Sequence, residues 1–553
     1  MGGSLVAALA RVAAGYLLGA GNYASARRVL DWGLRYAPDD PDLNALRGQC
    51  CLRTAALLGP RRLPDAIAFL EEADSALERA IAARPRDWEL HRQQGLTLLR
   101  LAWAREAREP GSPQRDLLRQ AVDAMSVVLE AQPRRADVLH ERGMAWASLR
   151  VGAPEGEAEA ALGRALEDLD SSLRMRPHAY ETQFHRAELS LELARLHRRA
   201  GRRGAEKAAA SAALDGSAHL LRARPGWEPV LLLRALAATA LARLGEDPLG
   251  LTDLAISSAS AVLEQDPRHA RALLVRAEAR VITACHLALQ SDVRAGLVWR
   301  QALADLESAS DAVGLRGRED VGALRAGARG EWGLAQHRAG AIDGARDAWI
   351  RALEDFDRAV DDDPVDADRL TGRARVLAGL ADLAPRPDER AERRRRAFDD
   401  LDQAAAIRPG DTNLLALRAS LVAAPGALPE ELAAALKEVE GALEATPEHA
   451  ALHEARRRLL LLLAMEAPPG PQRALAIAAA LLECDRAVRE EPADPQAHYD
   501  QARALFLGGR PAEAYAALEQ AIRAAPGLRH TARQDPVWAP VADAEGFRQL
   551  VER

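Results

Sequence analysis

The strongest constraint on the fold is a proline that recurs at a nearly regular interval along the 553 residues. Successive prolines of this set lie 34 to 48 residues apart, except for one gap of 97 residues that spans two periods and has Gly314 near the missing place. The set comprises Pro38, Pro85, Pro133, Pro177, Pro225, Pro267, Pro364, Pro409, Pro447, Pro492 and Pro526. Because proline cannot continue an α-helix, each marker proline predicts the end of a helical stretch.

Small residues stand at two fixed distances from the marker prolines. Twelve residues before each marker, counting Gly314 as one, the chain has alanine in all twelve cases. These are Ala26, Ala73, Ala121, Ala165, Ala213, Ala255, Ala302, Ala352, Ala397, Ala435, Ala480 and Ala514. Ten residues after most markers the chain has glycine or alanine, as at Gly48, Gly95 and Gly143. Since helices approach to about 8–10 Å only where the crossing residues are small, the pattern predicts repeated pairs of closely packed helices.

Composition supports a helical chain and argues against several classes of partner. The sequence is 48% hydrophobic but only 4% aromatic, and the helix formers alanine and leucine dominate it. We therefore predict an all-α fold. The net charge of −7 is small for this length, and acids and bases are interspersed, so we expect neither a nucleic-acid partner nor a membrane partner.

The cysteines and the N-terminal segment bear on the cellular compartment. The cysteines are Cys50, Cys51, Cys285 and Cys484. They have no disulfide or metal-site spacing, which indicates buried thiols in a reducing compartment. Residues 5–20 are apolar, but no positive charge precedes them and Arg11 interrupts the run, which disfavours a secretion signal. We predict a cytoplasmic protein without a membrane span.

The repeat resembles the tetratricopeptide repeat (TPR) family, whose 34-residue unit has small residues and a proline at fixed positions. In residues 495–526 that pattern is matched by Ala502, Gly509, Ala514, Ala521 and Pro526. The aromatic residue near the start of the unit is mostly absent, and His498 stands in its place here. The resemblance implies a right-handed α-solenoid of about twelve stacked helix-turn-helix repeats.

The repeats differ in length, which suggests a division of the chain. We predict a first TPR repeat at 5–38, lengthened TPR-like repeats at 39–311 and 346–492, and a last standard repeat at 493–526. Residues 312–345 are rich in glycine, which disfavours helix, and form either an irregular joint with a hinge or a closely packed segment. Residues 527–553 form a C-terminal capping segment, in which Val537, Trp538, Val541, Phe547 and Leu550 cover the last apolar face.

Arginines and acids recur in two rows relative to the markers. Nine residues after a marker stand Arg47, Arg142, Arg186, Arg234, Arg276, Arg373, Arg418 and Arg456. Nine residues before one stand Asp168, Asp305, Asp355, Asp400, Glu438 and Glu483. The geometry of the family brings these rows together. They form either ion pairs that lock the repeats in register or an arginine ladder for an anionic ligand.

The sequence contains no motif of a known enzyme class. Phosphate-binding loops, nucleophile elbows and kinase signatures are missing, so we predict no catalytic residue, no cofactor and no enzymatic activity. His449 and His453 have a spacing compatible with a metal, but no third ligand follows, and we predict no metal site. The basic runs at 198–203 and 393–396 lack interleaved aromatic residues and are interpreted as solvated surface.

In the family, the first helices of the repeats build an inner groove that holds peptides or partner helices. By register, the candidate groove residues are Glu89, Arg92, His140, Met144, Glu181, Phe184, Glu188, Arg271, Glu278, Arg375, Tyr499 and Arg503. The resemblance therefore implies a non-catalytic scaffold or adaptor that binds a protein or peptide in this groove. The alternatives are the regulatory or sensor region of a larger bacterial signalling enzyme, such as a serine/threonine protein kinase, and a pure structural spacer or self-associating array.

Overall fold

The computed structural model describes residues 2–58, 62–111, 114–245, 247–312, 314–423, 427–492 and 494–552, with the side chains of all of these except 2–4 and 314–320. Residues 493 and 553, which bound two of the predicted segments, lie outside the described residues. The chain divides into two compact units, Met1–Leu196 and His197–Arg553. Each unit is described by itself below.

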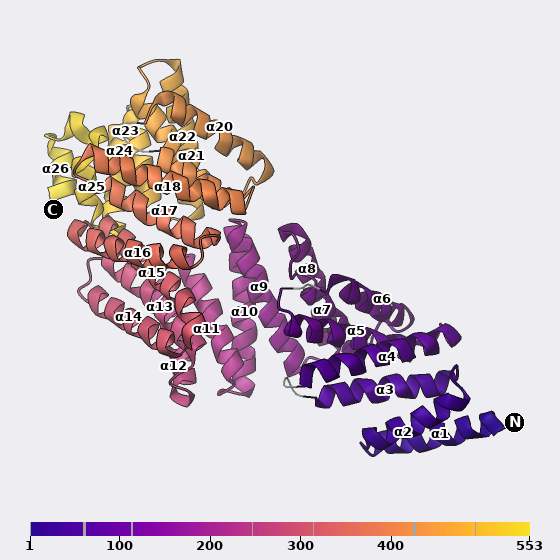
Figure 1. Ribbon diagram of the computed structural model, residues 1–553. Coiled ribbons are helices and arrows are strands. Elements are labelled where there is room, and N and C mark those ends of the chain that lie inside the picture. The colour runs from indigo at the N-terminus through magenta and orange to yellow at the C-terminus, as the bar shows by residue number, and fades with distance from the viewer. Residues whose placement is uncertain are drawn as a thin grey trace. The chain divides into compact units, whose positions relative to one another are not determined.

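Helices make up the regular structure of the described residues, and they follow one another in pairs (Figure 1). The first unit contains α1 (Gly2–Gly19), α2 (Tyr23–Tyr36), α3 (Pro41–Leu57), α4 (Leu63–Ala83), α5 (Trp88–Arg108), α6 (Arg115–Ala131), α7 (Ala136–Ser148), α8 (Glu155–Met175) and most of α9 (Tyr180–Arg199). Within it, α1 packs on α2, α3 on α4, α5 on α6 and α7 on α8. Successive pairs also touch, for example where α4 of one pair contacts α5 of the next.

The second unit continues the same alternation. It contains α10 (Arg203–Ala223), α11 (Glu228–Arg243), α12 (Pro248–Gln265), α13 (Ala270–Leu289), α14 (Ala295–Ala312), α15 (Gly314–Arg338), α16 (Ile342–Asp362), α17 (Ala367–Asp382), α18 (Pro387–Ile407), α19 (Thr412–Val422), α20 (Pro429–Ala445), α21 (Ala450–Glu466), α22 (Pro471–Glu490), α23 (Pro495–Leu507) and α24 (Pro511–Ala524). Two short helices, α25 (Leu528–Gln534) and α26 (Glu545–Glu552), and the 3₁₀ helix η2 (Pro536–Val541) follow. The described chain is therefore all-α and built from packed helix pairs.

The turn from one pair to the next has a constant length. Four residues separate α2 from α3, namely 37–40, and the same number lies at each later junction except that between α14 and α15. The marker proline is the second residue of the turn, and the fourth is often an aspartate that caps the next helix. Asp40, for example, accepts hydrogen bonds from the backbone N–H groups of Asp42 and Leu43 at 3.0 Å. The variable length of the repeats therefore lies in the helices and in the loops within each pair.

The alanines before the markers lie where the helices of a pair cross. Of the twelve, eleven have no exposed surface and Ala435 is 8% exposed. The small residues of the first helices face them. A Cβ atom added at Gly143 would lie 3.1 Å from the carbonyl oxygen of Ala165, and one at Gly95 would lie 3.2 Å from that of Ala121. The two rows thus let the helix backbones approach closely, as the sequence predicted.

The glycine-rich segment contains a long helix packed on tryptophan. α15 runs over 25 residues and packs on α13, α14, α16 and α17. A Cβ atom at Gly333 or at Gly379 would come within 2.7 Å of the indole of Trp349 on α16. The same indole donates a hydrogen bond from Nε1 to the carbonyl oxygen of Gly330 at 3.1 Å. Close packing thus accounts for the glycine at 333, whereas a Cβ atom at Gly322 or Gly327 would meet nothing within 4 Å.

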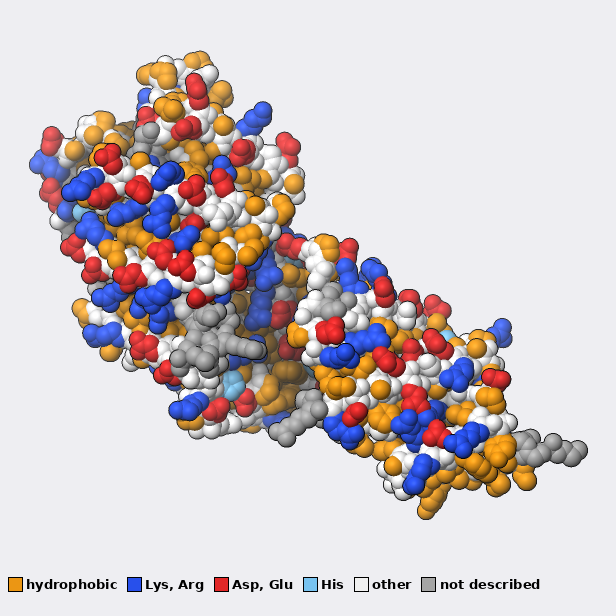
Figure 2. Space-filling view, in the orientation of Figure 1, with side chains coloured by type: hydrophobic (Ala, Val, Ile, Leu, Met, Phe, Trp, Pro, Cys, Tyr) orange, Lys and Arg blue, Asp and Glu red, His pale blue; other side chains and the backbone are white. Residues whose placement is uncertain are grey.

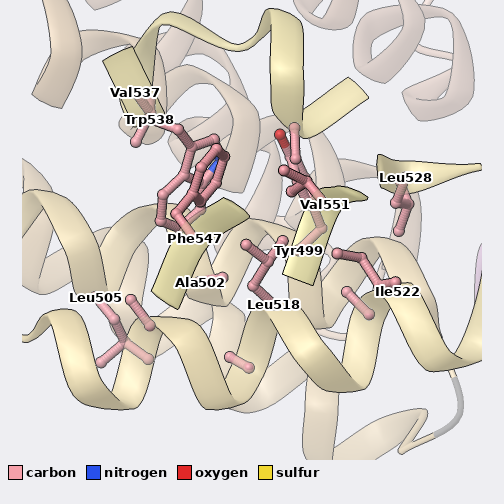
Figure 3. Packing of buried hydrophobic residues seen from close by; sticks show 14 of the residues in the cluster. Tyr499, Ala502, Leu505, Leu518, Ile522, Leu528, Val537, Trp538, Phe547 and Val551 are labelled. Carbon is pink, nitrogen blue, oxygen red and sulfur yellow. The ribbon is translucent and has the colours of Figure 1, made fainter. Parts of the chain in front are cut away.

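The C-terminal end of the array is covered by the chain itself (Figure 3). Trp538 of η2 is 1% exposed and stacks on Phe547 of α26, with ring centroids 5.5 Å apart. Together with Val551, these rings pack over Leu518 and Ile522 of α24. Burying two aromatic rings removes a large apolar area from water.

Helices far apart in the sequence also touch within the second unit. The turn between α9 and α10 contacts the starts of α19 and α21. Asn413 donates a hydrogen bond to the carbonyl oxygen of Arg199 at 2.7 Å, and the N–H of Ala450 donates to that of Gly201 at 3.3 Å. Arg203 forms an ion pair with Glu491. Contacts other than those between neighbouring pairs thus add to the stability of this unit.

Candidate functional site: the first-helix face

The first-helix face of unit 1 consists of residues on α5, α7 and the start of α9, the first helices of three successive pairs. Of the predicted groove residues, Glu89 and Arg92 lie on α5, His140 and Met144 on α7, and Glu181, Phe184 and Glu188 on α9. Glu181 and Glu188 are exposed, whereas the other five are partly buried. This face therefore offers charged groups to solvent beside half-buried apolar and aromatic side chains.

Polar contacts connect α5 with α7 on this face. The Arg92 guanidinium lies 2.9 Å from the Glu89 carboxylate on its own helix and 3.5 Å from that of Glu141 on α7. Burial raises the pKa of Glu141 to about 7, and the Arg92 charge opposes that rise. Glu141 was not among the predicted groove residues, although it directly follows one of them, His140.

A second set of contacts connects α7 with α9. Nδ1 of His140 lies 2.9 Å from the hydroxyl of Thr182, and the ring of His140 lies 5.2 Å from that of His185. Thr182 and His185 were also missed. Because Glu181 and His185 stand one helical turn apart, both can reach the same neighbour on α7.

The remaining candidates lie in the second unit, and they have different surroundings. Arg271 on α13 and Arg375 on α17 are exposed, whereas Glu278 on α13 is paired with Arg243 of α11. Tyr499 on α23 is only 2% exposed. Of these five, only Tyr499 and Arg503 are brought together by contacts with a common group.

That common group is Asp535, just before η2. The Tyr499 hydroxyl donates a hydrogen bond to the Asp535 carboxylate at 2.8 Å, and the Arg503 guanidinium lies 3.0 Å from it. Burial is the main cause of the raised pKa of Tyr499, and the nearby Asp535 adds to it. Both predicted groove residues therefore contact the protein's own C-terminal segment, because that segment folds back over α23.

The arginine row is used for packing between helices. Four arginines on first helices pair with an acid on the second helix of the same pair: Arg142 with Asp168, Arg276 with Asp305 and Arg373 with Asp400 at 2.7 Å, and Arg456 with Glu483 at 2.6 Å. Several also reach back sixteen residues to the preceding pair, as Arg373 does to Asp357 at 3.1 Å. One guanidinium can thus join three helices, which favours the structural interpretation of the row over an anion ladder.

One acid and one arginine of the two rows show how the register varies. Asp355 follows the missing marker and pairs at 3.0 Å with Arg325, which stands two residues later than the spacing predicts. Arg418 pairs backwards with Asp402. The row is therefore preserved across the irregular α14–α15 junction by a shifted arginine.

His449 and His453, whose spacing suggested a metal, have other partners. His449 is 1% exposed and accepts a hydrogen bond from the N–H of Leu452 at the start of α21. His453 lies 2.9 Å from Glu483 and 2.8 Å from the carbonyl oxygen of Pro447. Their contacts fix a helix start and a turn between pairs.

These features define the class of protein: in each unit the described residues form an α-solenoid of stacked helix pairs. Among the described helices, none combines the length and the apolar character needed to cross a lipid bilayer. No family model and no curated protein matches the sequence.

Among solved structures, the chain is similar to several helical repeat proteins. A tetratricopeptide repeat protein from Parabacteroides merdae is 17% identical, with a TM-score of 0.37, over 59% of this chain and 98% of its own. Yeast Tom70 is 12% identical, with a TM-score of 0.32, over 97% and 99%. The human IFIT1 dimer with m7Gppp-AAAA is 12% identical, with a TM-score of 0.35, over 78% and 90%. At such scores the neighbours do not indicate what this chain binds.

Proposed function

We propose that this chain is a non-catalytic scaffold that binds a protein or peptide through the first helices of its repeats. The observation that supports it most is the continuity of the first-helix face of unit 1. Contacts from Arg92 to Glu141 and from His140 to Thr182 connect three successive first helices into one polar surface. Such a surface can follow an extended peptide or a partner helix over several repeats.

The charges on this face indicate the kind of partner. Glu89, Glu181 and Glu188 outnumber Arg92 among the predicted residues there, which favours a partner segment that carries basic residues. Nucleic acid is not expected, because many arginines of the chain are engaged with acids. Figure 2 shows positive and negative side chains interspersed over much of the visible surface, rather than gathered by sign.

Affinity capture with charge-reversal variants tests this proposal. Glu188→Arg in the first unit and Arg375→Glu in the second change exposed first-helix residues and should weaken capture of a specific partner about tenfold or more. The matched controls, Glu167→Arg on α8 and Arg395→Glu on α18, make the same reversals at exposed positions of second helices. If the first-helix variants keep every partner that the controls keep, the proposal fails.

Two other hypotheses are separated by direct measurements. A reading frame that continues into a catalytic domain would support the regulatory region of a larger signalling enzyme. Light scattering over a range of concentrations would reveal self-association. The structure of the described residues favours neither over the scaffold.

A further inference from the structure

Three side chains with metal-binding groups converge between α7 and α9. One ring nitrogen each of His140 and His185 and a carboxylate oxygen of Glu181 all lie within 4.8 Å of one another. Glu181 and His185 share one face of α9, because residues four apart lie one turn above each other. His140 faces them from α7, with its ring tilted by 46° to that of His185.

The surroundings orient these groups. The hydroxyl of Thr182, a residue that is 4% exposed, lies 2.9 Å from Nδ1 of His140. This contact holds the His140 ring in place. Nδ1 of His185 is buried and has no hydrogen-bond partner among the described residues. Leaving a buried nitrogen unsatisfied is costly, so this atom points to a missing partner.

The local charges favour a cation in this place. The two imidazoles offer ring nitrogens and Glu181 offers a carboxylate oxygen, and all three are groups that bind divalent metal ions in proteins. The acids Glu181 and Glu188 both lie close enough to His185 to act on it electrostatically. The cluster thus combines two imidazoles with nearby negative charge.

We propose that His140, Glu181 and His185 form a binding site for a zinc-like divalent metal ion between α7 and α9. Two imidazoles and one carboxylate are a ligand set that zinc accepts in proteins, and such three-ligand sites keep one coordination position open. The bound ion joins the first helices of two successive pairs and satisfies the orphaned nitrogen of His185. This inference does not depend on the proposed partner binding.

The sequence alone predicted no metal site because its ligands come from different repeats. His140 stands 41 residues before Glu181, and only the Glu181–His185 spacing of four is visible locally. A search that aligns successive first helices on their marker prolines would place His140 and His185 at neighbouring positions, seven and eight residues after Pro133 and Pro177.

Zinc titration of the EDTA-treated full chain tests the site. Isothermal titration should show one Zn²⁺ ion per chain, and Zn²⁺ should raise the melting temperature. Co²⁺ should compete and show the visible absorption of a protein-bound ion. The buried thiols should not contribute, because burial raises their pKa, that of Cys51 to about 12. Absence of saturable Zn²⁺ binding would overturn the proposal.

Ligand variants locate the site. His185→Gln and Glu181→Gln should each weaken Zn²⁺ binding about 100-fold or more, and Thr182→Ala about tenfold, because it removes only the orienting contact. The matched control is His453→Gln, which removes a histidine that also faces a carboxylate, that of Glu483. This control should bind Zn²⁺ like the wild type.

Folding and binding remain distinguishable in these variants. Glu181 is exposed, so Glu181→Gln should keep the helical circular dichroism and melting temperature of the metal-free wild type. Zn²⁺ binding that survives in a His140→Gln/His185→Gln double variant, or that is lost equally in His453→Gln, would place the ion elsewhere and refute the assignment.

Discussion

The N-terminal and C-terminal helices differ in how far their large apolar side chains are exposed to solvent. At the C-terminal end, Trp538, Phe547 and Val551 are no more than 3% exposed and lie over α24. At the N-terminal end, α1 leaves Leu9, Val12 and Tyr16 between 56% and 78% exposed. In Figure 2 hydrophobic side chains gather over α1 and α2. One end buries its large apolar residues, and the other presents them to solvent.

The inner side of α1 explains what holds the N-terminal pair together. Its buried residues are mostly alanines, among them Ala7, Ala10 and Ala14, with Leu18 as the largest side chain. Alanine allows close approach but removes little apolar area from water. Because each repeat contacts mainly its neighbours, the stability of an end depends on its own packing. We therefore expect the C-terminal end to open less readily than the N-terminal end.

The largest effect on this contrast should come from Trp538→Ala. Truncating a buried tryptophan typically costs about 3–5 kcal/mol, and here it also removes the stack on Phe547. Hydrogen exchange should show faster exchange in α24 and α26, and chemical denaturation should show lower stability. The control is Tyr16→Ala, whose side chain is 78% exposed and should cost no more than about 0.5 kcal/mol. Equal losses from both variants would mean that the ends do not differ.

A smaller effect is expected from Tyr499→Phe. The change removes the hydrogen bond to Asp535 at 2.8 Å and keeps the ring in its core, so it should cost about 1 kcal/mol. Tyr36→Phe removes the hydroxyl of a residue that is 59% exposed near the other end and should change nothing measurable. Chemical denaturation of the two variants beside the wild type compares them. An unchanged Tyr499→Phe variant would show that the hydrogen bond from Tyr499 to Asp535 does not stabilise the C-terminal segment.

The packing of the helix pairs could be predicted from the sequence because the close approach of two helix backbones requires small residues at fixed positions. Each crossing needs a small residue at a fixed distance from the marker proline, as at Ala165 and Gly143. The pairing of Arg142 with Asp168 could also be predicted, since both residues stand at fixed distances in sequence from a marker proline. Periodic contacts repeat in the sequence and can therefore be read from it.

Features that occur once were harder to predict. The shift of Arg325 by two residues follows from the irregular α14–α15 junction, which has no marker proline. Tyr499 has the register of a groove residue, but its burial depends on how the chain folds back after Pro526. The cluster at His140 combines side chains from two successive repeats. Such contacts depend on tertiary structure and leave no periodic signal.

The smallest expected effect is a pH dependence of the N-terminal end, where polar contacts of Asp42 add to the packing of alanines. Asp42 on α3 lies 2.6 Å from Arg11 of α1 and 2.8 Å from Arg84, and its contact with Arg84 is the main cause of its lowered pKa. Because this pKa is lower in the folded state than the ordinary 3.8, the contribution of the Asp42 carboxylate to stability is complete above pH 3.8 and is lost as the pH falls through the folded value.

Hydrogen exchange between about pH 5 and pH 3, corrected for intrinsic rates, should therefore show α1 opening more readily in acid. Asp42→Asn should open more readily throughout and lose this dependence, and Arg11→Met should do the same, because Arg11 is the side chain of α1 that contacts Asp42. If Asp42→Asn and the wild type open alike across this range, alanine packing alone holds the N-terminal pair.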